Sequence, residues 1–202
     1  MRTIFLTGAL LAGLLSPCSR VAWAQGQQPS SPRALWSSTD LALTFTTEDA
    51  KVTPGGSSFW LNGGSLEGAT SFAHGFGFAA NMTVEHASKF TPGLDLGETI
   101  LMAGPRYTYH RGSKHESRIF AEALAGEVRA SGDIFPTSKG ASDKSNAFSW
   151  QAGGGWDISI TKHIAVRAIE ADYVRTYLPN NGNNTQDHIR LAVGVVYHFQ
   201  NH

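Results

Sequence analysis

Residues 188–199, near the end of the chain, alternate between apolar and other side chains with a period of two. The odd positions hold Ile189, Leu191, Val193, Val195, Tyr197 and Phe199. The even positions hold His188, Arg190, Ala192, Gly194, Val196 and His198. Because successive side chains of a β-strand point to opposite faces, this pattern predicts a strand with one wholly apolar face.

Earlier segments repeat this pattern, with glycines on the polar face. We predict eight strands, at 40–47, 58–72, 76–86, 99–110, 118–129, 147–160, 164–177 and 188–199. Polar loops at 48–57, 91–96, 130–145 and 179–187 alternate with short turns at 73–75, 112–117 and 161–163. Apolar outer faces, polar inner faces and this asymmetry of connections are typical of membrane barrels. The predicted fold is all-β: an eight-stranded antiparallel up-and-down transmembrane β-barrel.

Two positions depart from simple alternation. In the segment 164–177, strict alternation would place Glu170 and Asp172 on the face opposite Arg167. A bulge near Ala168 would turn all three inward; the alternative is that one acid lies near an interface and faces water. Pro105 cannot donate to the strand ladder, which predicts a bulge or a rim position there.

The first residues have the features of a secretory leader. Arg2 precedes an apolar run at 4–15, and Ala22-Trp23-Ala24 forms a small-residue cleavage motif. We predict a signal peptide at 1–24, a flexible lead-in at 25–39 and a barrel domain at 40–202. Cys18 is the only cysteine of the chain and lies in the leader. The mature protein therefore has no thiol for a disulfide or for thiol chemistry.

Charge and hydropathy narrow the function classes. The 202 residues include 16 Lys and Arg against 16 Asp and Glu, and loss of Arg2 and Arg20 with the leader leaves 14 against 16. This near balance argues against nucleic acid as a partner, which would require a basic patch. No later stretch reaches the ~20 apolar residues of a membrane helix. A membrane role therefore requires a closed barrel.

Several segments resemble those of a known family. They are SFWLNGG (58–64), MAGPRYTY (102–109), FAEALAG (120–126), AVRAIEADY (165–173) and RLAVGVVYHF (190–199). Together they resemble bacterial outer-membrane β-barrel proteins of the OmpA-like transmembrane-domain type, over nearly all of 40–199. The resemblance implies an outer-membrane location, contact with the lipid bilayer and lipopolysaccharide, and insertion by machinery that reads the C-terminal strand. We expect a monomer without a cofactor, and the sequence indicates no protein partner. One departure is that Gln200-Asn201-His202 follow Phe199, where such barrels often end on the aromatic residue.

Charged side chains on the predicted inner faces are the first candidate site. They are Glu67, Glu85, Arg106, Glu122, Arg167, Glu170, Asp172 and Arg190. Side chains fill the interior of an eight-stranded barrel, and buried charges need partners. We favour a salt-bridged core that closes the barrel. The functional alternative is a narrow or gated ion path in which Arg106 or Arg167 exchanges carboxylate partners.

Aromatic residues near strand ends or on outer faces form the second candidate set. They are Trp60, Tyr107, Tyr109, Trp150, Trp156, Tyr173, Tyr177 and Tyr197. Belts of Trp and Tyr at the two membrane interfaces would explain their placement. The alternative is the core of a soluble barrel.

Evidence for catalysis is weak. His115-Glu116-Ser117 formally matches the His-x-Ser pair of one type of lipid A deacylase, but it lies in a predicted short turn with charged neighbours. The eight histidines show no metal-ligand spacing, so we expect surface or rim positions for them. We assign no catalytic residue, metal or cofactor.

These observations predict a non-enzymatic barrel of the bacterial outer membrane with a structural or envelope-interface role and at most small gated ion conductance. The alternatives are a genuine small-solute or ion pore, a soluble ligand-binding barrel and, last, a lipid A-modifying hydrolase. The soluble barrel would place Leu191, Val193 and Val195 inside and Arg190 in water.

Overall fold

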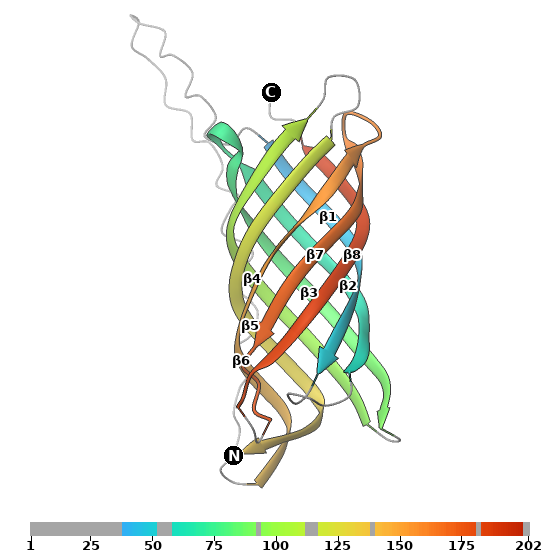
Figure 1. Ribbon diagram of the computed structural model, residues 1–202, viewed down its shortest axis with the longest axis vertical. Helices are drawn as coiled ribbons and strands as arrows, with labels where there is room; N and C mark the ends of the chain where they lie inside the picture. Colours follow the sequence, from blue (N-terminus) through green and yellow to red (C-terminus); the bar gives the residue numbers. More distant parts are fainter. Residues whose placement is uncertain are drawn as a thin grey trace, which may run out of the picture. The chain divides into compact units, whose positions relative to one another are not determined.

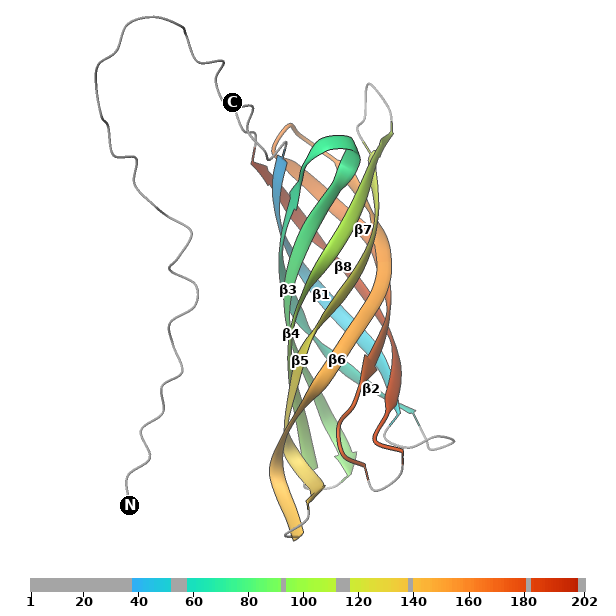
Figure 2. The ribbon, with the colours of Figure 1, turned by 90° about the vertical axis from the view of Figure 1, so that its left-hand side faces the viewer.

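The computed structural model describes residues 38–51, 58–91, 94–111, 117–137, 140–180 and 183–199. The predicted leader and almost all of the lead-in lie outside these ranges. The eight strands are β1 (Ser38–Lys51), β2 (Ser58–Ser71), β3 (Phe76–Thr91), β4 (Leu94–Arg111), β5 (Ser117–Thr137), β6 (Gly140–Ser159), β7 (Ile164–Thr176) and β8 (Gln186–Phe199). Each strand pairs antiparallel with its neighbours in sequence, and β1 also pairs with β8. The predicted all-β, eight-stranded up-and-down barrel is confirmed (Figures 1 and 2).

The barrel has two distinct ends. The start of β1, the end of β8 and the connections β2–β3, β4–β5 and β6–β7 lie at one end, here called the turn end. The other four connections lie at the opposite loop end. A short 3₁₀ turn, η1 (Ala73–Gly75), joins β2 to β3 at the predicted tight turn. Its residues His74 and Gly75 have φ of 63° and 83°, the left-handed conformation that tight turns favour.

Two predicted loops are largely strand. Only residues 92–93 separate β3 from β4, and only 138–139 separate β5 from β6, so the predicted loops 91–96 and 130–145 are wrong in extent. The β5–β6 hairpin extends beyond the other strands at the loop end, where the register shifts between Ser131 and Phe135 around Gly132 (Figure 1). These segments lack an apolar face, and backbone pairing between adjacent strands extends them regardless of side-chain pattern. The first strand likewise begins at Ser38 and runs on to Lys51, past both of its predicted ends.

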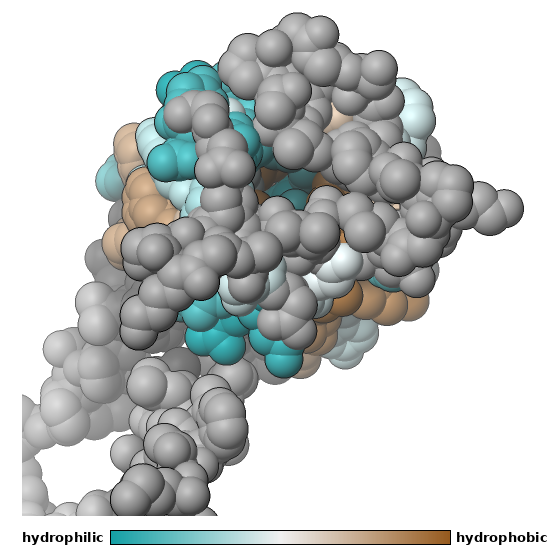
Figure 3. Space-filling view, turned by 90° about the horizontal axis from the view of Figure 1, so that it is seen from below, coloured by the Kyte–Doolittle hydropathy of each residue, from teal (hydrophilic) through white to brown (hydrophobic). Residues whose placement is uncertain are grey.

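The strand faces follow the alternation. Along β8, Leu191, Val193 and Val195 are 40–53% exposed on the outer wall, whereas Arg190 on the inner face is 2% exposed. Seen end on, hydrophobic residues form patches around the outer wall (Figure 3). This is the reverse of the arrangement that a soluble barrel requires.

The predicted bulge in β7 is present. The pairing of β7 with β8 moves from Arg167–Gly194 to Glu170–Ala192, so two residues of β7 face one residue of β8. This extra residue restores the phase, and Arg167, Glu170 and Asp172 are all buried.

The expectation for Pro105 is wrong. It lies within β4 and pairs with Phe78 of β3, away from the rim. On its other side the pairing with β5 lapses between Ala103–Ala125 and Arg106–Glu122, but the register does not shift. Because proline lacks an N–H, the ladder loses a bond at this point without gaining a residue.

Candidate functional site

The barrel interior encloses the charged side chains that the sequence places on inner faces. Each is at most 6% exposed: Glu67, Glu85, Arg106, Glu122, Arg167, Glu170, Asp172 and Arg190. The structure adds further charged or titratable side chains to the same interior: Asp40, Glu48, Glu98, Arg118, Asp157, His188 and His198. They form three groups along the barrel.

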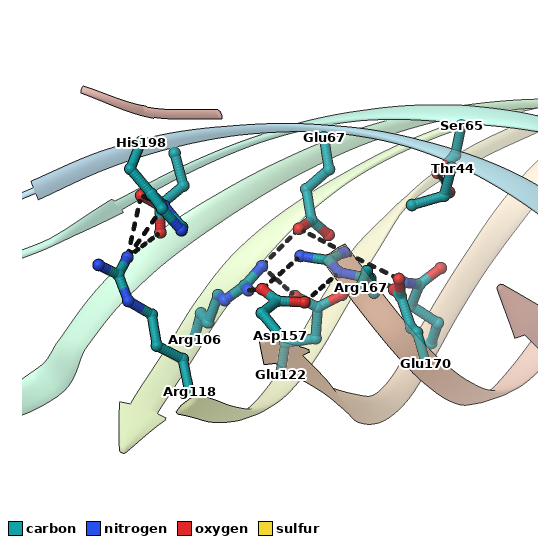
Figure 4. Close-up of polar contacts among 12 residues, drawn as sticks. Thr44, Ser65, Glu67, Arg106, Arg118, Glu122, Asp157, Arg167, Glu170 and His198 are labelled. Atoms are coloured by element: carbon teal, nitrogen blue, oxygen red, sulfur yellow. Dashed lines mark hydrogen bonds and ion pairs between the residues drawn. The ribbon is translucent and has the colours of Figure 1, made fainter. Parts of the chain in front are cut away.

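The turn-end cluster consists of Glu67, Arg106, Glu122, Asp157, Arg167 and Glu170. Arg167 donates to Asp157 at 2.9 Å, to Glu67 at 3.0 Å and to Glu170 at 2.8 Å (Figure 4). Arg106 ion-pairs with Glu67 and lies 3.4 Å from Glu122. Two guanidinium groups thus bridge carboxylates from four other strand positions across the interior.

An aromatic ring supports both arginines of this cluster. The ring centroid of Phe120 lies 3.6 Å from the guanidinium carbon of Arg106 and 4.4 Å from that of Arg167. A guanidinium over an aromatic face gains ~0.5–2 kcal/mol, more where water is excluded. Phe120 is only 3% exposed, so it contributes to holding both cations in place.

The loop-end cluster consists of Glu48, Glu85, Glu98, Asp172, His188 and Arg190. Arg190 lies 2.8 Å from Glu48 and 3.3 Å from Glu85, and His188 lies 3.0 Å from Glu48. Gln151 connects the clusters, since it accepts from Arg190 at 3.2 Å and donates to Glu122 at 3.2 Å. Glu98 Oε2 and Asp172 Oδ1 have no protein hydrogen-bond partner in the described part of the chain.

A third group, made of Asp40, Arg118 and His198, lies closer to the turn-end rim than the turn-end cluster does. His198 Nδ1 is 2.7 Å from Asp40 Oδ1, and Arg118 is within 3.5 Å of the same carboxylate. His188 and His198 are 4% and 3% exposed, so the expectation of a surface position is wrong for these two histidines, although His198 does lie near the turn-end rim. Both histidines occupy even-numbered positions of 188–199, which the sequence assigns to the polar face of that strand. Closure of β8 against β1 buries them beside Glu48 and Asp40.

The other missed residues have identifiable reasons. Glu48 and Glu98 fell in or beside predicted loops because the strands were drawn too short. The alternation of residues 147–160 places Asp157 on the same face as Ser149 and Gln151, but this pattern alone does not show which charge it meets. Its pairing opposite Arg167 in the structure makes it part of the turn-end cluster.

Part of the interior is apolar, which the polar-face reading did not predict. A buried cluster comprises Ala50, Leu61, Ala69, Ala79, Ala87, Leu96, Ile100, Met102, Leu124, Val128, Ala130, Val174 and Leu178. Leu61 and Leu96 lie near the loop ends of β2 and β4, and Leu178 lies two residues after the loop end of β7. Apolar side chains therefore fill the interior beside and beyond the loop-end cluster.

The buried charges do not balance. Eight buried carboxylates (Glu48, Glu67, Glu85, Glu98, Glu122, Asp157, Glu170 and Asp172) face three buried arginines and two buried histidines among the described residues. The excess of acid favours a cation over an anion anywhere along this interior.

The geometry favours ion pairing over metal binding. Carboxylate oxygens of Glu67, Glu122 and Glu170 lie within 4.8 Å of one another, a spacing that could suit a cation. Arg106 and Arg167 already ion-pair with all three. The guanidinium groups thus supply the positive charge that a metal would otherwise supply.

The aromatic candidates lie on the outer wall in two groups. Tyr107, Tyr109, Trp156 and Tyr197 lie toward the turn ends of their strands, and Trp60, Trp150, Tyr173 and Tyr177 lie toward the loop end. Neighbouring rings pack together: Tyr107 on Phe76 with centroids 5.0 Å apart, and Trp150 on Tyr173 at 5.6 Å. The apolar residues between the two groups form a band on the outer wall.

The catalytic alternative gains no geometric support. His115 and Glu116 lie outside the described residues. The Ser117 hydroxyl donates to the Arg111 carbonyl at 3.3 Å, as expected at the start of a strand. In the described ranges, no helix has the length and apolar character needed to cross a membrane.

The fold is similar to those of solved outer-membrane proteins. Ail, the attachment invasion locus protein of Yersinia pestis, aligns with a TM-score of 0.53 and 16% identity over 80% of this chain and 98% of Ail. Neisserial surface protein A aligns with a TM-score of 0.57 and 17% identity over 79% of this chain and 96% of that protein. No family model and no curated protein matches the sequence. The resemblance predicted from the sequence is therefore confirmed at the level of fold: the chain has the fold of the small eight-stranded outer-membrane barrels.

Proposed function

We propose that this chain is an integral barrel of the bacterial outer membrane, exported by a leader at 1–24, with a structural or envelope-interface role and no enzymatic activity. This proposal rests on the distribution of side chains, which is the reverse of that in a soluble protein. Large apolar residues such as Phe45, Leu101 and Val195 are 53–61% exposed on the outer wall, while the charges lie inside. Leaving each apolar side chain in water forfeits ~1.5–3 kcal/mol, so a lipid exterior accounts for the wall.

The belts of aromatic rings and the arrangement of connections support the same assignment. Trp and Tyr favour membrane interfaces. The longest connection, from β7 to β8, and the β5–β6 hairpin that extends beyond the other strands both lie at the loop end (Figure 1), and such barrels carry their longer extensions outside the cell. We infer that the loop end faces the medium and that the turn end faces the periplasm. Bilayer lipid and lipopolysaccharide are then the immediate partners of the wall, and a monomer suffices to bury the charges.

The interior supports a closed barrel. Arg106 and Arg167 tie carboxylates across the turn-end cluster, and Leu61, Leu96 and Leu178 fill the loop end. An eight-stranded interior is only wide enough for its own side chains. We therefore expect no steady current through the unmodified protein.

A narrow cation path is the second candidate, because buried acid exceeds buried base. Rearrangement of Arg106 or Arg167 would open it along the carboxylates. Any current through it should then prefer cations over anions.

The test is expression of the full chain in a Gram-negative host, followed by extraction from the outer-membrane fraction and reconstitution in planar bilayers. Heat-modifiable migration in electrophoresis reports the folded barrel. Stable insertion without current supports the closed barrel, whereas steady cation-selective openings support the path. Current through Arg106→Ala/Arg167→Ala but not through the wild-type protein would show that the two arginines close a cation path, whereas no current in either would leave the closed barrel. A chain that stays soluble without detergent would overturn the membrane assignment.

A further inference from the structure

A groove of about 180 Å³ lies on the outer wall. The residues Met82, Thr99, Leu101, Glu127 and Arg129 of β3, β4 and β5 line it, and they define what we call the outer-wall groove. The strand register explains its shape. Met82, Leu101 and Glu127 form one cross-strand row, and Thr99 pairs with Arg129 in the next row toward the loop end. The short side chain of Thr99 leaves a hollow between longer neighbours.

The β3–β4 side of the groove is apolar. Met82 and Leu101 are 46% and 61% exposed on the wall. Toward the turn end, the next row of paired outward residues is Ala80, Ala103 and Ala125. These methyl groups continue the hollow as a smooth strip in the apolar band, which suits an extended acyl chain.

The β5 side of the groove is charged. Arg129 Nε donates to Glu127 Oε1 at 3.2 Å, and the two side chains are 58% and 46% exposed. Within the described part of the chain, Nε is the atom of Arg129 that is engaged, which leaves its terminal amino groups able to donate. Guanidinium donors match phosphate oxygens, and a carboxylate accepts from hydroxyl groups.

We propose that the outer-wall groove binds one phosphorylated glycolipid of the outer leaflet. Its phosphate would lie on Arg129, its sugar hydroxyls on Glu127, and one acyl chain along Met82 and Leu101. This inference rests on the proposed membrane function, which places the loop end outside. A lipid that carries phosphate and hydroxyl groups matches the acid–base pair better than one that carries phosphate alone.

The test measures lipid binding to the folded full-length protein, extracted in detergent and titrated with lipid A under native mass spectrometry. Arg129→Gln should weaken binding about tenfold or more, the equivalent of one lost charged hydrogen bond. Thr99→Trp, which fills the hollow but keeps Arg129, should weaken binding similarly. Dephosphorylated lipid A should bind the wild-type protein as weakly as lipid A binds the Arg129→Gln variant.

Arg175→Gln is the matched control. Arg175 is also outward, and its Nε also donates to a carboxylate, that of Asp187, but it does not line the groove. Its substitution should leave binding unchanged. An equal loss in this variant, or unaltered binding in Arg129→Gln, would overturn the proposal.

Two further measurements distinguish an error in the proposed ligand from an error in the membrane assignment. Equal binding of phosphatidylglycerol would show a general response to lipid phosphate and would overturn the choice of a glycolipid. Heat-modifiable migration of every variant reports the barrel independently. A folded barrel that binds no lipid A would overturn only the proposed lipid binding by the groove, whereas a chain that never inserts would overturn the proposed membrane function.

Discussion

The two charged clusters of the interior hold their carboxylates in different ways. In the turn-end cluster, two arginines stacked on Phe120 bind four carboxylates, and Arg167 alone contacts three of them. In the loop-end cluster, Arg190 and His188 stand among four carboxylates, and Glu98 Oε2 has no partner in the described structure. Every carboxylate of the first cluster contacts an arginine, as in a bracing network, whereas Glu98 and Asp172 of the second each have a carboxylate oxygen without a partner in the described structure. Their responses to substitution should therefore differ.

The largest expected effect is that of Arg167→Ala. Its removal leaves Glu67, Asp157 and Glu170 with one fewer buried cation, and breaking a buried pair costs ~3–5 kcal/mol. Urea unfolding of the folded barrel in detergent, followed by electrophoretic mobility, measures the loss. A change below about 1 kcal/mol, the range of exposed pairs, would contradict the bracing role.

Carboxylate neutralisation separates the two clusters most directly. Glu67→Gln removes the negative charge shared by Arg106 and Arg167 and should lower the free energy of unfolding by ~1.5–3 kcal/mol. Glu98→Gln neutralises a buried carboxylate of the loop-end cluster whose Oε2 has no partner in the described structure, so it should leave stability unchanged or raise it. The same urea titration compares these two Glu→Gln variants. Equal losses in both variants would mean that the clusters do not differ.

The next largest loss of stability should come from crowding the side chain of Asp172. Gly153 of β6 pairs with Asp172, and a β-carbon at position 153 would overlap the Asp172 carboxylate and the Ala171 carbonyl. Gly153→Ala should therefore cost ~1–3 kcal/mol by overpacking. Gly68→Ala is its control, because a β-carbon at Gly68 meets no atom within 4 Å. If both alanine variants unfold alike, close packing does not position Asp172.

The smallest effect should come from an ion pair on the outer wall. Arg175 pairs with Asp187 where both side chains are partly exposed, and solvent screens such pairs. Arg175→Gln should unfold at the same urea concentration as the wild-type protein within the resolution of the titration. A loss comparable to that of Arg167→Ala would remove the distinction between interior and exterior arginines.

The limits of prediction from sequence can be seen in individual residues. Local alternation correctly predicted the strand count, the faces and the bulge after Arg167, because an unpaired charge on a lipid-facing wall is costly. It did not predict the extended hairpins beyond 129 and before 147, where pairing with the adjacent strand acts without an apolar pattern. It also misjudged Pro105, since the absence of one ladder bond leaves the register intact.

The sequence by itself determined which side chains face inward, because a period of two assigns every residue of a strand to a face. It could not determine which inward charges meet. Glu67 and Arg167 lie 100 positions apart, and Glu48 and Arg190 lie 142 apart. Their contact depends on the strand register and on closure of β1 against β8, which are properties of the whole barrel. Only the tertiary structure therefore decided that the inner charges divide into one cluster in which every carboxylate contacts an arginine and another in which some carboxylate oxygens have no partner among the described residues.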